Sequence, residues 1–164
     1  MSVLKKALYI KDVPSKGKGL FTKINVPKGK VIIEFQGSIV DRSSLTFPYE
    51  NIPKVQNLKQ IAKDQYLSIS GDMDDYINHS CNPNCSFMIR GARAFLEALY
   101  DIAPDTELTF DYSITSTDTL DEWKMNCSCG TYGCRKIISG YSYLSDSKKS
   151  EYEKLNIVPK YVKA

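Results

Sequence analysis

The chain has 164 residues, of which 25% are charged and 42% hydrophobic, as is usual for one soluble globular domain. Its apolar runs are only a few residues long and its first residues are polar, so we expect neither a membrane span nor a signal peptide. The net charge of +3 permits an acidic partner but falls far short of the basic stripe of a dedicated nucleic-acid binder.

The first half of the chain is dominated by turn and strand signals. A Pro-Lys-Gly-Lys turn at 27–30 precedes a β-branched run at 31–35, which predicts a strand. Residues 41–64 are polar and carry two prolines, which indicates a loop with at most one short helix around 55–62. The run at 95–100 fits a strand or a helix, because a short apolar run does not decide between them.

The second half repeats this layout. A turn at 103–106 leads into a second predicted strand at 107–112, and the Ser-, Thr- and Asp-rich residues 113–126 predict a loop. Residues 145–155 have helical composition, and we expect Pro159 to end that helix. No linker divides the chain, so the sequence predicts one mainly β, β-rich α+β domain with few helices.

Three cysteines in eight residues, in the pattern Cys127-x-Cys129-x4-Cys134, have the density of a metal site. Zn²⁺ prefers four thiolates in a tetrahedron, so Cys81 or Cys85 must supply the fourth ligand. Ordinary buried thiols are one alternative. A redox pair is another, although no Cys-x-x-Cys precedes a helix. A site closed by four protein sulfurs would be structural and not catalytic.

Four motifs follow one another along the chain: the glycine pair of 16–21, Asn-His-Ser-Cys-x-Pro-Asn at 78–84, Glu-Leu-Thr-Phe-Asp-Tyr at 107–112, and the cysteine pattern. In this order they resemble the SET-domain protein lysine methyltransferases with a post-SET zinc segment. Gly-x-Gly alone would be a weak signal. The tail also looks like that of small stand-alone bacterial and archaeal members. The resemblance implies small β-sheets around a pseudoknot, with a SET domain at 1–113 and a post-SET segment and tail at 114–164 as one structural unit.

The resemblance also implies a cofactor, S-adenosylmethionine, and a structural Zn²⁺. The residues expected to hold the cofactor come from the glycine motif, the Asn-His step and two tyrosines: Lys16, Gly17, Lys18, Gly19, Leu20, Phe21, Tyr66, Asn78, His79 and Tyr112. Glycines would allow close backbone approach, and the single histidine would act mainly through its backbone, with a satisfied core histidine as the alternative. The zinc ligands implied are Cys81, Cys127, Cys129 and Cys134, which leaves Cys85 as a small buried hydrophobe.

Three aromatic residues receive roles in the reaction from this resemblance. Tyr112, at the end of the predicted strand, is the main catalytic residue, with its hydroxyl beside the transferring methyl group. A strand tyrosine is ordinarily a packing residue, so the motif alone supports this role. Tyr66 looks like a second channel tyrosine. Phe110 stands where family members carry Phe or Tyr, and its missing hydroxyl predicts room for di- or trimethylation.

One step departs from the family pattern. Members often carry a basic residue shortly before the Asn-His-Ser step, whereas this chain has Asp74 and Asp75 there. We therefore expect Lys16 or Lys18 to hold the cofactor carboxylate. Asp72, Asp74 and Asp75 form either an acidic rim for a basic peptide or a solvated loop.

The function implied is an S-adenosylmethionine-dependent protein-lysine N-methyltransferase. Its partner would be a lysine-containing protein or peptide, such as a histone or another basic chromatin protein, with no specific nucleic-acid contact and no membrane. We expect a monomer, in the cytoplasm with access to the nucleoid if the source is prokaryotic, and in the nucleus if it is eukaryotic or viral. The alternatives are a non-catalytic SET-like module that binds peptide or nucleic acid and a purely structural zinc module.

Overall fold

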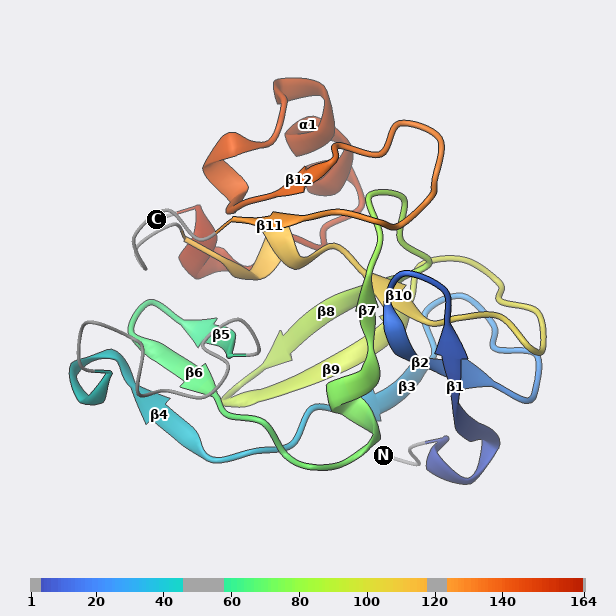
Figure 1. Ribbon diagram of the computed structural model, residues 1–164. Coiled ribbons are helices and arrows are strands. Elements are labelled where there is room, and N and C mark those ends of the chain that lie inside the picture. Colours follow the sequence, from blue (N-terminus) through green and yellow to red (C-terminus); the bar gives the residue numbers. More distant parts are fainter. Residues whose placement is uncertain (1–3, 46–57, 118–123, 164) are drawn as a thin grey trace.

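Several small sheets make up most of the computed structural model, which describes residues 4–45, 58–117 and 124–163 (Figure 1). The two-stranded sheets are β1 (Leu8–Val13) with β2 (Gly17–Thr22), β7 (Asn78–His79) with β10 (Thr109–Phe110), and β11 (Met125–Asn126) with β12 (Ile137–Ile138). The three-stranded sheets have the orders β3 (Val31–Glu34), β9 (Arg93–Ala98), β8 (Cys85–Arg90) and β4 (Ile39–Asp41), β6 (Gln65–Leu67), β5 (Lys59–Ala62). These sheets confirm the β-rich prediction.

Helical structure is sparse. One α-helix, α1 (Asp146–Lys154), lies in the described part of the chain. The 3₁₀ turns cover Lys5–Ala7, Arg42–Ser44, Met73–Tyr76, Tyr112–Thr115, Tyr141–Tyr143 and Lys160–Val162. None of the helices among the described residues has the length and apolar character needed to cross a membrane.

The sheet β3–β9–β8 forms the centre of the core. Strand β9 lies between two antiparallel partners, and Leu96 on it is fully buried, as are Ile32 on β3 and Phe87 on β8. The strand predicted at 31–35 is confirmed over Val31–Glu34. Residues 95–98 of the run at 95–100 belong to strand β9, which pairs on both sides with β3 and β8, and the strand ends at Ala98.

The short helix expected around 55–62 is wrong where the structure describes it. Lys59–Ala62 is strand β5, which pairs with β6 and buries Gln60 and Ile61. A polar local composition was overridden by tertiary pairing. The rest of that prediction, residues 46–57, lies outside the described residues.

The helix expected at 145–155 is confirmed as α1. Ser145 caps it, since its Oγ accepts a hydrogen bond from the Lys148 backbone at 3.3 Å. The helix ends before Pro159, contrary to expectation, because Asn156 takes a left-handed backbone with φ 53°.

Residues 78–79 and 109–110, which are far apart in the sequence, run side by side. Strand β7 pairs in parallel with β10, with Asn78 opposite Thr109 and His79 opposite Phe110. Figure 1 shows β7 passing through the middle of the molecule, and the loop after it reaching the C-terminal segment. The Asn-His segment therefore lies directly beside β10, as the arrangement implied by the resemblance requires.

The strand predicted at 107–112 is shorter than expected. Its ladder ends at Phe110, because Asp111 turns its carboxylate inward to accept the Ser113 N–H and so starts the 3₁₀ turn Tyr112–Thr115. The predicted loop 113–126 likewise contains the end of this turn and strand β11, and residues 118–123 lie outside the described residues. The division at residue 113 falls inside the turn and stays a prediction.

Candidate functional site

Four thiols gather where the loop after β7 meets the C-terminal segment. The Sγ atoms of Cys81, Cys127, Cys129 and Cys134 all lie within 4.8 Å of one another. Thiolates bound at about 2.3 Å in a tetrahedron lie about 3.8 Å apart, and the Cys81 and Cys127 sulfurs are 3.7 Å apart. The donor set therefore fits Zn²⁺, and Cys81, not Cys85, completes it. Cys85 is fully buried elsewhere, as predicted for a small hydrophobe.

Hydrogen-bond donors surround the cluster. The Arg135 N–H donates to Cys81 Sγ at 3.4 Å, and Thr131 Oγ1 lies 3.1 Å from Cys129 Sγ. Burial raises the pKa of the Cys81 thiol, whereas a bound divalent cation holds its thiolate ligands deprotonated. Backbone and hydroxyl donors of this kind orient metal ligands and share their negative charge.

His79 connects this cluster to the end of β10. Its Nδ1 accepts the Tyr112 backbone N–H at 3.2 Å, so the ring proton sits on Nε2, 3.2 Å from Cys81 Sγ. Burial lowers the pKa of His79 to about 4, and a neutral ring makes no ion pair with Asp111, whose Oδ1 is 3.5 Å from Nδ1. The alternative of a satisfied core histidine is correct for the side chain. A backbone role toward a cofactor stays a prediction.

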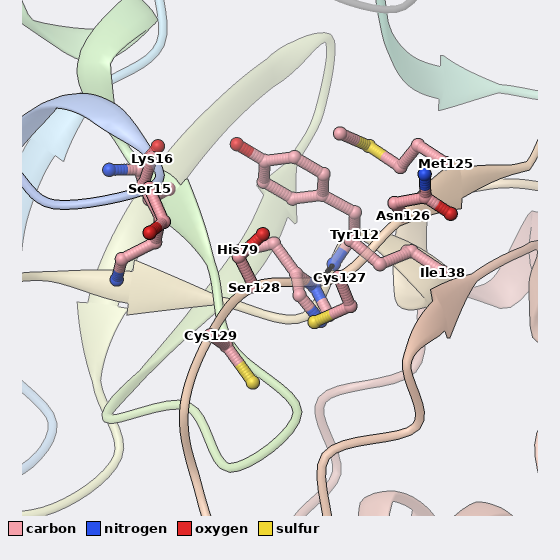
Figure 2. Close-up of a pocket in the computed structure, with 11 residues that line it drawn as sticks. Ser15, Lys16, His79, Tyr112, Met125, Asn126, Cys127, Ser128, Cys129 and Ile138 are labelled. Atoms are coloured by element: carbon pink, nitrogen blue, oxygen red, sulfur yellow. Dashed lines mark hydrogen bonds between the residues drawn. The ribbon is translucent and has the colours of Figure 1, made fainter.

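A pocket opens beside the cluster. The residues that line it come from the β1–β2 turn, from β7, from the turn after β10 and from the C-terminal segment: Ser15, Lys16, Asn78, His79, Tyr112, Met125, Asn126, Cys127, Ser128, Cys129 and Ile138. Figure 2 shows the Tyr112 ring between the turn that carries Ser15 and Lys16 and the strand that carries Met125. The volume of the pocket, about 190 Å³, is below the ~300 Å³ of small ligand pockets. A larger ligand would therefore extend beyond the mouth of the pocket.

Tyr112 is held at both ends. Its hydroxyl donates to the Ile77 carbonyl at 2.7 Å, and its ring lies 5.4 Å from the His79 ring and 4.9 Å from the Phe110 ring, centre to centre. Burial, and then the charge of Glu107, raise the pKa of the Tyr112 phenol. The phenol therefore stays protonated near neutral pH, and it can polarise a neighbour without acting as a general base.

Glu107 joins the glycine motif to the Asn-His step. Its carboxylate accepts hydrogen bonds from Lys16 Nζ at 2.5 Å and from Asn78 Nδ2 at 2.8 Å. The same Asn78 amide donates to the Lys18 carbonyl at 3.0 Å. Lys16 thus stands at the pocket with its charge partly balanced, and its expected role toward a cofactor carboxylate stays a prediction.

The structure gives reasons for Gly17 and Gly19 that differ from the expected close approach of the backbone to a cofactor. Gly17 has φ +78°, which the tight turn before β2 requires. A Cβ on Gly19 would lie 2.7 Å from Glu107 Oε1 and 3.1 Å from Asn78 Nδ2. Gly19 therefore makes room for the Asn78–Glu107 contact.

Some predicted site residues are not among those that line the pocket. Leu20 is fully buried in the core, and the Phe21 ring packs against Tyr9 at 5.5 Å between ring centres. Tyr66, on β6, and Phe110 are also buried. Phe110 packs against Phe87 and Phe35 as well as Tyr112, so it forms the floor beneath the Tyr112 ring.

Of the acidic residues before the Asn-His step, Asp72 is partly exposed, pairs with Lys5 and caps the turn Met73–Tyr76, whereas Asp74 and Asp75 form neither a rim nor a solvated loop. Asp74 is 1% exposed and accepts hydrogen bonds from the Gln36 N–H and the Ser70 hydroxyl. Asp75 accepts the backbone N–H groups of Ser70 and Gly71. Both carboxylates build the turn that leads into β7, because backbone donors there need buried acceptors.

Sequence reasoning assigned no role to Asp111, Arg135 or Tyr152. The Asp111 carboxylate is fully buried, and it accepts two hydrogen bonds from the Arg135 guanidinium and one from the Tyr152 hydroxyl, each at 2.7 Å. An aspartate inside an apolar run is a local signal for a buried partner. Nothing local identifies which distant residues supply it.

The geometry matches a known family. A family model described as SET domain matches residues 17–113, more than half of the chain, so the chain belongs to the SET-domain family. Histone-lysine N-methyltransferase NSD3 of Mus musculus is 33% identical over 129 residues, which are 73% of this chain and 9% of that protein. The chain spans less than a tenth of the length of the first curated relatives it matches.

Solved structures share the fold. Arabidopsis thaliana SUVH6 in complex with SAM aligns with a TM-score of 0.68 at 21% identity, over 80% of this chain and 33% of that one. KRYPTONITE in complex with mCHH DNA, an H3(1–15) peptide and SAH aligns with a TM-score of 0.64 at 21% identity, over 80% and 29%. At these identities the alignments show that the small sheets described above are arranged as in SET domains.

Proposed function

We propose that this chain is an S-adenosylmethionine-dependent protein-lysine N-methyltransferase. Membership of the SET-domain family supports the proposal, as do the names of curated relatives, which are histone-lysine N-methyltransferases. The observation that carries it is a protonated, partly buried Tyr112 at a pocket that it shares with Asn78, His79 and Lys16. Four thiols that fit Zn²⁺ hold one wall of that pocket.

Bound S-adenosylmethionine would supply a methyl group on a positively charged sulfur. The residues expected to hold it are Asn78, His79 and the backbone of the glycine motif, with Lys16 beside its carboxylate. The lysine substrate must arrive uncharged, and deprotonating free lysine at neutral pH costs about 4 kcal/mol. Tyr112 stays protonated near neutral pH and so has no basic form to accept that proton, and the buried His79 is too weak a base for it. We infer that desolvation and a nearby positive charge lower the pKa of the substrate amine.

Tyr112 then has a geometric role. Its donated hydrogen bond to the Ile77 carbonyl fixes the phenol, so that one face of its oxygen can contact the transferring methyl group. Alignment of amine, methyl and sulfur can supply several kcal/mol of a displacement barrier, on the order of 7 kcal/mol when geometry is ideal. The partner we propose is a lysine in a histone or another basic protein.

The test is transfer of a labelled methyl group from S-adenosylmethionine to histones and to proteins of a whole-cell extract. We expect the wild type to label a band and Tyr112→Phe to reduce the rate about 100-fold, because the ring loses its hydrogen bond to the Ile77 carbonyl and a small misplacement of reacting groups can cost that much. Tyr100→Phe, at an exposed tyrosine, is the matched control. Stabilisation by S-adenosylhomocysteine without any transfer would favour a binding module, and no response to either compound would favour a structural zinc module.

Phe110 supports a finer proposal, that the product reaches the di- or trimethylated state. Its ring contributes no hydroxyl beside Tyr112, which leaves space for a methylated amine. Mass spectrometry of the product should show more than one methyl group for the wild type and a shift to monomethylation for Phe110→Tyr. A wild type that stops at one methyl group would contradict this. Monomeric state and a cytoplasmic or nuclear location, according to source, stay proposals.

A further inference from the structure

Asp111 stands directly before Tyr112, and its carboxylate accepts four hydrogen bonds. It is fully buried, and although burial alone would raise its pKa, the hydrogen bonds from Arg135 keep the pKa of Asp111 below its usual value. The Ser113 N–H also donates to Oδ1 at 3.0 Å. The carboxylate is therefore charged and bonded on every side.

These contacts fix the backbone of Tyr112. Because Ser113 donates to Asp111, the side chain caps the 3₁₀ turn whose first residue is Tyr112. On the opposite side, the Tyr112 N–H donates to His79 Nδ1. Any rotation of the Asp111 carboxylate would move the turn, and with it the Tyr112 phenol.

Tyr152 reaches this carboxylate from helix α1, 41 residues further along the chain. It is 1% exposed, its ring belongs to the apolar core, and its hydroxyl donates to Asp111 Oδ2 at 2.7 Å. A phenylalanine ring would fill the same buried space, so packing alone does not explain the hydroxyl of Tyr152. Arg135 neutralises the carboxylate through both oxygens, while Tyr152 bonds the remaining side of Oδ2.

We propose that Tyr152 is a positioning residue for Tyr112, which it orients through the Asp111 carboxylate. Helix α1 thereby completes the site from outside the residues matched by the family model, which end at 113. The kinetic consequence rests on the proposed methyl transfer. The structural consequence, a displaced Tyr112, does not.

The test compares Tyr152→Phe with Tyr143→Phe, the same change at a tyrosine of the C-terminal segment that is 56% exposed. Both variants keep their rings, so both should fold. Activity is measured well below the unfolding midpoint of the less stable variant. We expect kcat of Tyr152→Phe to fall on the order of tenfold with the KM for S-adenosylmethionine little changed, since small misplacements of reacting groups can cost up to about 100-fold.

A second readout needs no turnover. The chain has one histidine, so ¹⁵N spectra contain a single pair of imidazole nitrogen signals. His79 Nδ1 accepts the Tyr112 N–H and lies 3.5 Å from Asp111 Oδ1, so its signal reports on both residues. We expect Tyr152→Phe to shift the Nδ1 signal and Tyr143→Phe to leave it in place.

The outcomes separate this inference from the proposed function. A lower unfolding midpoint with kcat within about twofold of the control would reduce Tyr152 to a packing residue and overturn the inference. An unmoved Nδ1 signal would overturn it too, whatever the activity. A wild type without transfer activity would refute the proposed function, while the Nδ1 signal would still decide whether Tyr152 positions Tyr112.

Discussion

The sheet β3–β9–β8 and the C-terminal segment 124–163 are stabilised in different ways. The sheet buries whole rows of apolar side chains, with Ile32, Phe87 and Leu96 fully removed from solvent. In α1, by contrast, Tyr152 is the one buried residue. Strands β11 and β12 have two residues each, too short to be stable without other contacts.

The C-terminal segment is held to the rest of the molecule mainly by a few specific contacts, whereas the sheet is stabilised by burial of apolar surface. The segment also packs Ile138, Leu144 and Ile157 inward, but its specific attachments are the cysteine cluster and the hydrogen bonds of Asp111. Apolar burial is spread over many residues, so each loss is partial. A cluster or a buried charge concentrates the free energy in a few atoms, where a single change has a large effect.

The largest effect should come from losing the metal. We expect a chelator, or Cys134→Ser, to abolish methyl transfer and to increase hydrogen exchange across residues 124–163, with much smaller changes in the sheet β3–β9–β8. The reason is that a structural zinc site contributes its binding free energy to the fold around it. Hydrogen–deuterium exchange with and without zinc, beside metal analysis, is the measurement.

Cys85→Ser is the contrasting variant. Cys85 is the first residue of β8, opposite Ala98 of β9, and its fully buried thiol lies outside the cluster, so the substitution should destabilise the sheet while zinc stoichiometry stays the same. Unchanged turnover after complete removal of zinc would show that the C-terminal segment does not need the metal.

The next effect concerns the buried ion pair. Arg135→Met leaves the Asp111 charge without its main partner, and removing one member of a buried pair costs about 3–5 kcal/mol of unfolding free energy. Arg93→Met is the matched control, because Arg93 also pairs with a carboxylate, that of Glu34, but is mostly exposed to solvent. Chemical denaturation should show a large loss for the first variant and little change for the second. Equal losses of unfolding free energy in the two variants would mean that the burial of Asp111 does not make its ion pair with Arg135 more important than an exposed one.

The same contrast explains how much the sequence could predict. The β-branched run before Glu34 and the helix after Ser145 follow from local composition. Three cysteines in eight residues predict a metal site, but only the family resemblance assigns the fourth ligand, Cys81. Strand β5 does not follow from local composition, because Gln60 is buried through pairing with β6 and not through its own character. Asp111 could be recognised as unusual, but its partners Arg135 and Tyr152 are chosen only when the tail folds back onto the core.

The smallest effect should arise where the hairpin β1–β2 touches the pocket. In Gly19→Ala the new Cβ would clash with Glu107 Oε1 and Asn78 Nδ2. Because Asn78 Nδ2 donates a hydrogen bond to Glu107 Oε1, at least one of the two side chains must move and weaken this hydrogen bond. We expect a loss of about 1 kcal/mol in unfolding free energy, as in mild overpacking, and about tenfold weaker binding of S-adenosylhomocysteine by calorimetry. Gly91→Ala, in the turn between β8 and β9, has φ +64° and no atom near its Cβ position, so it strains the backbone without reaching the pocket. If both variants lose stability but bind the ligand as the wild type does, Gly19 serves packing alone and the Asn78–Glu107 contact is not part of the binding site.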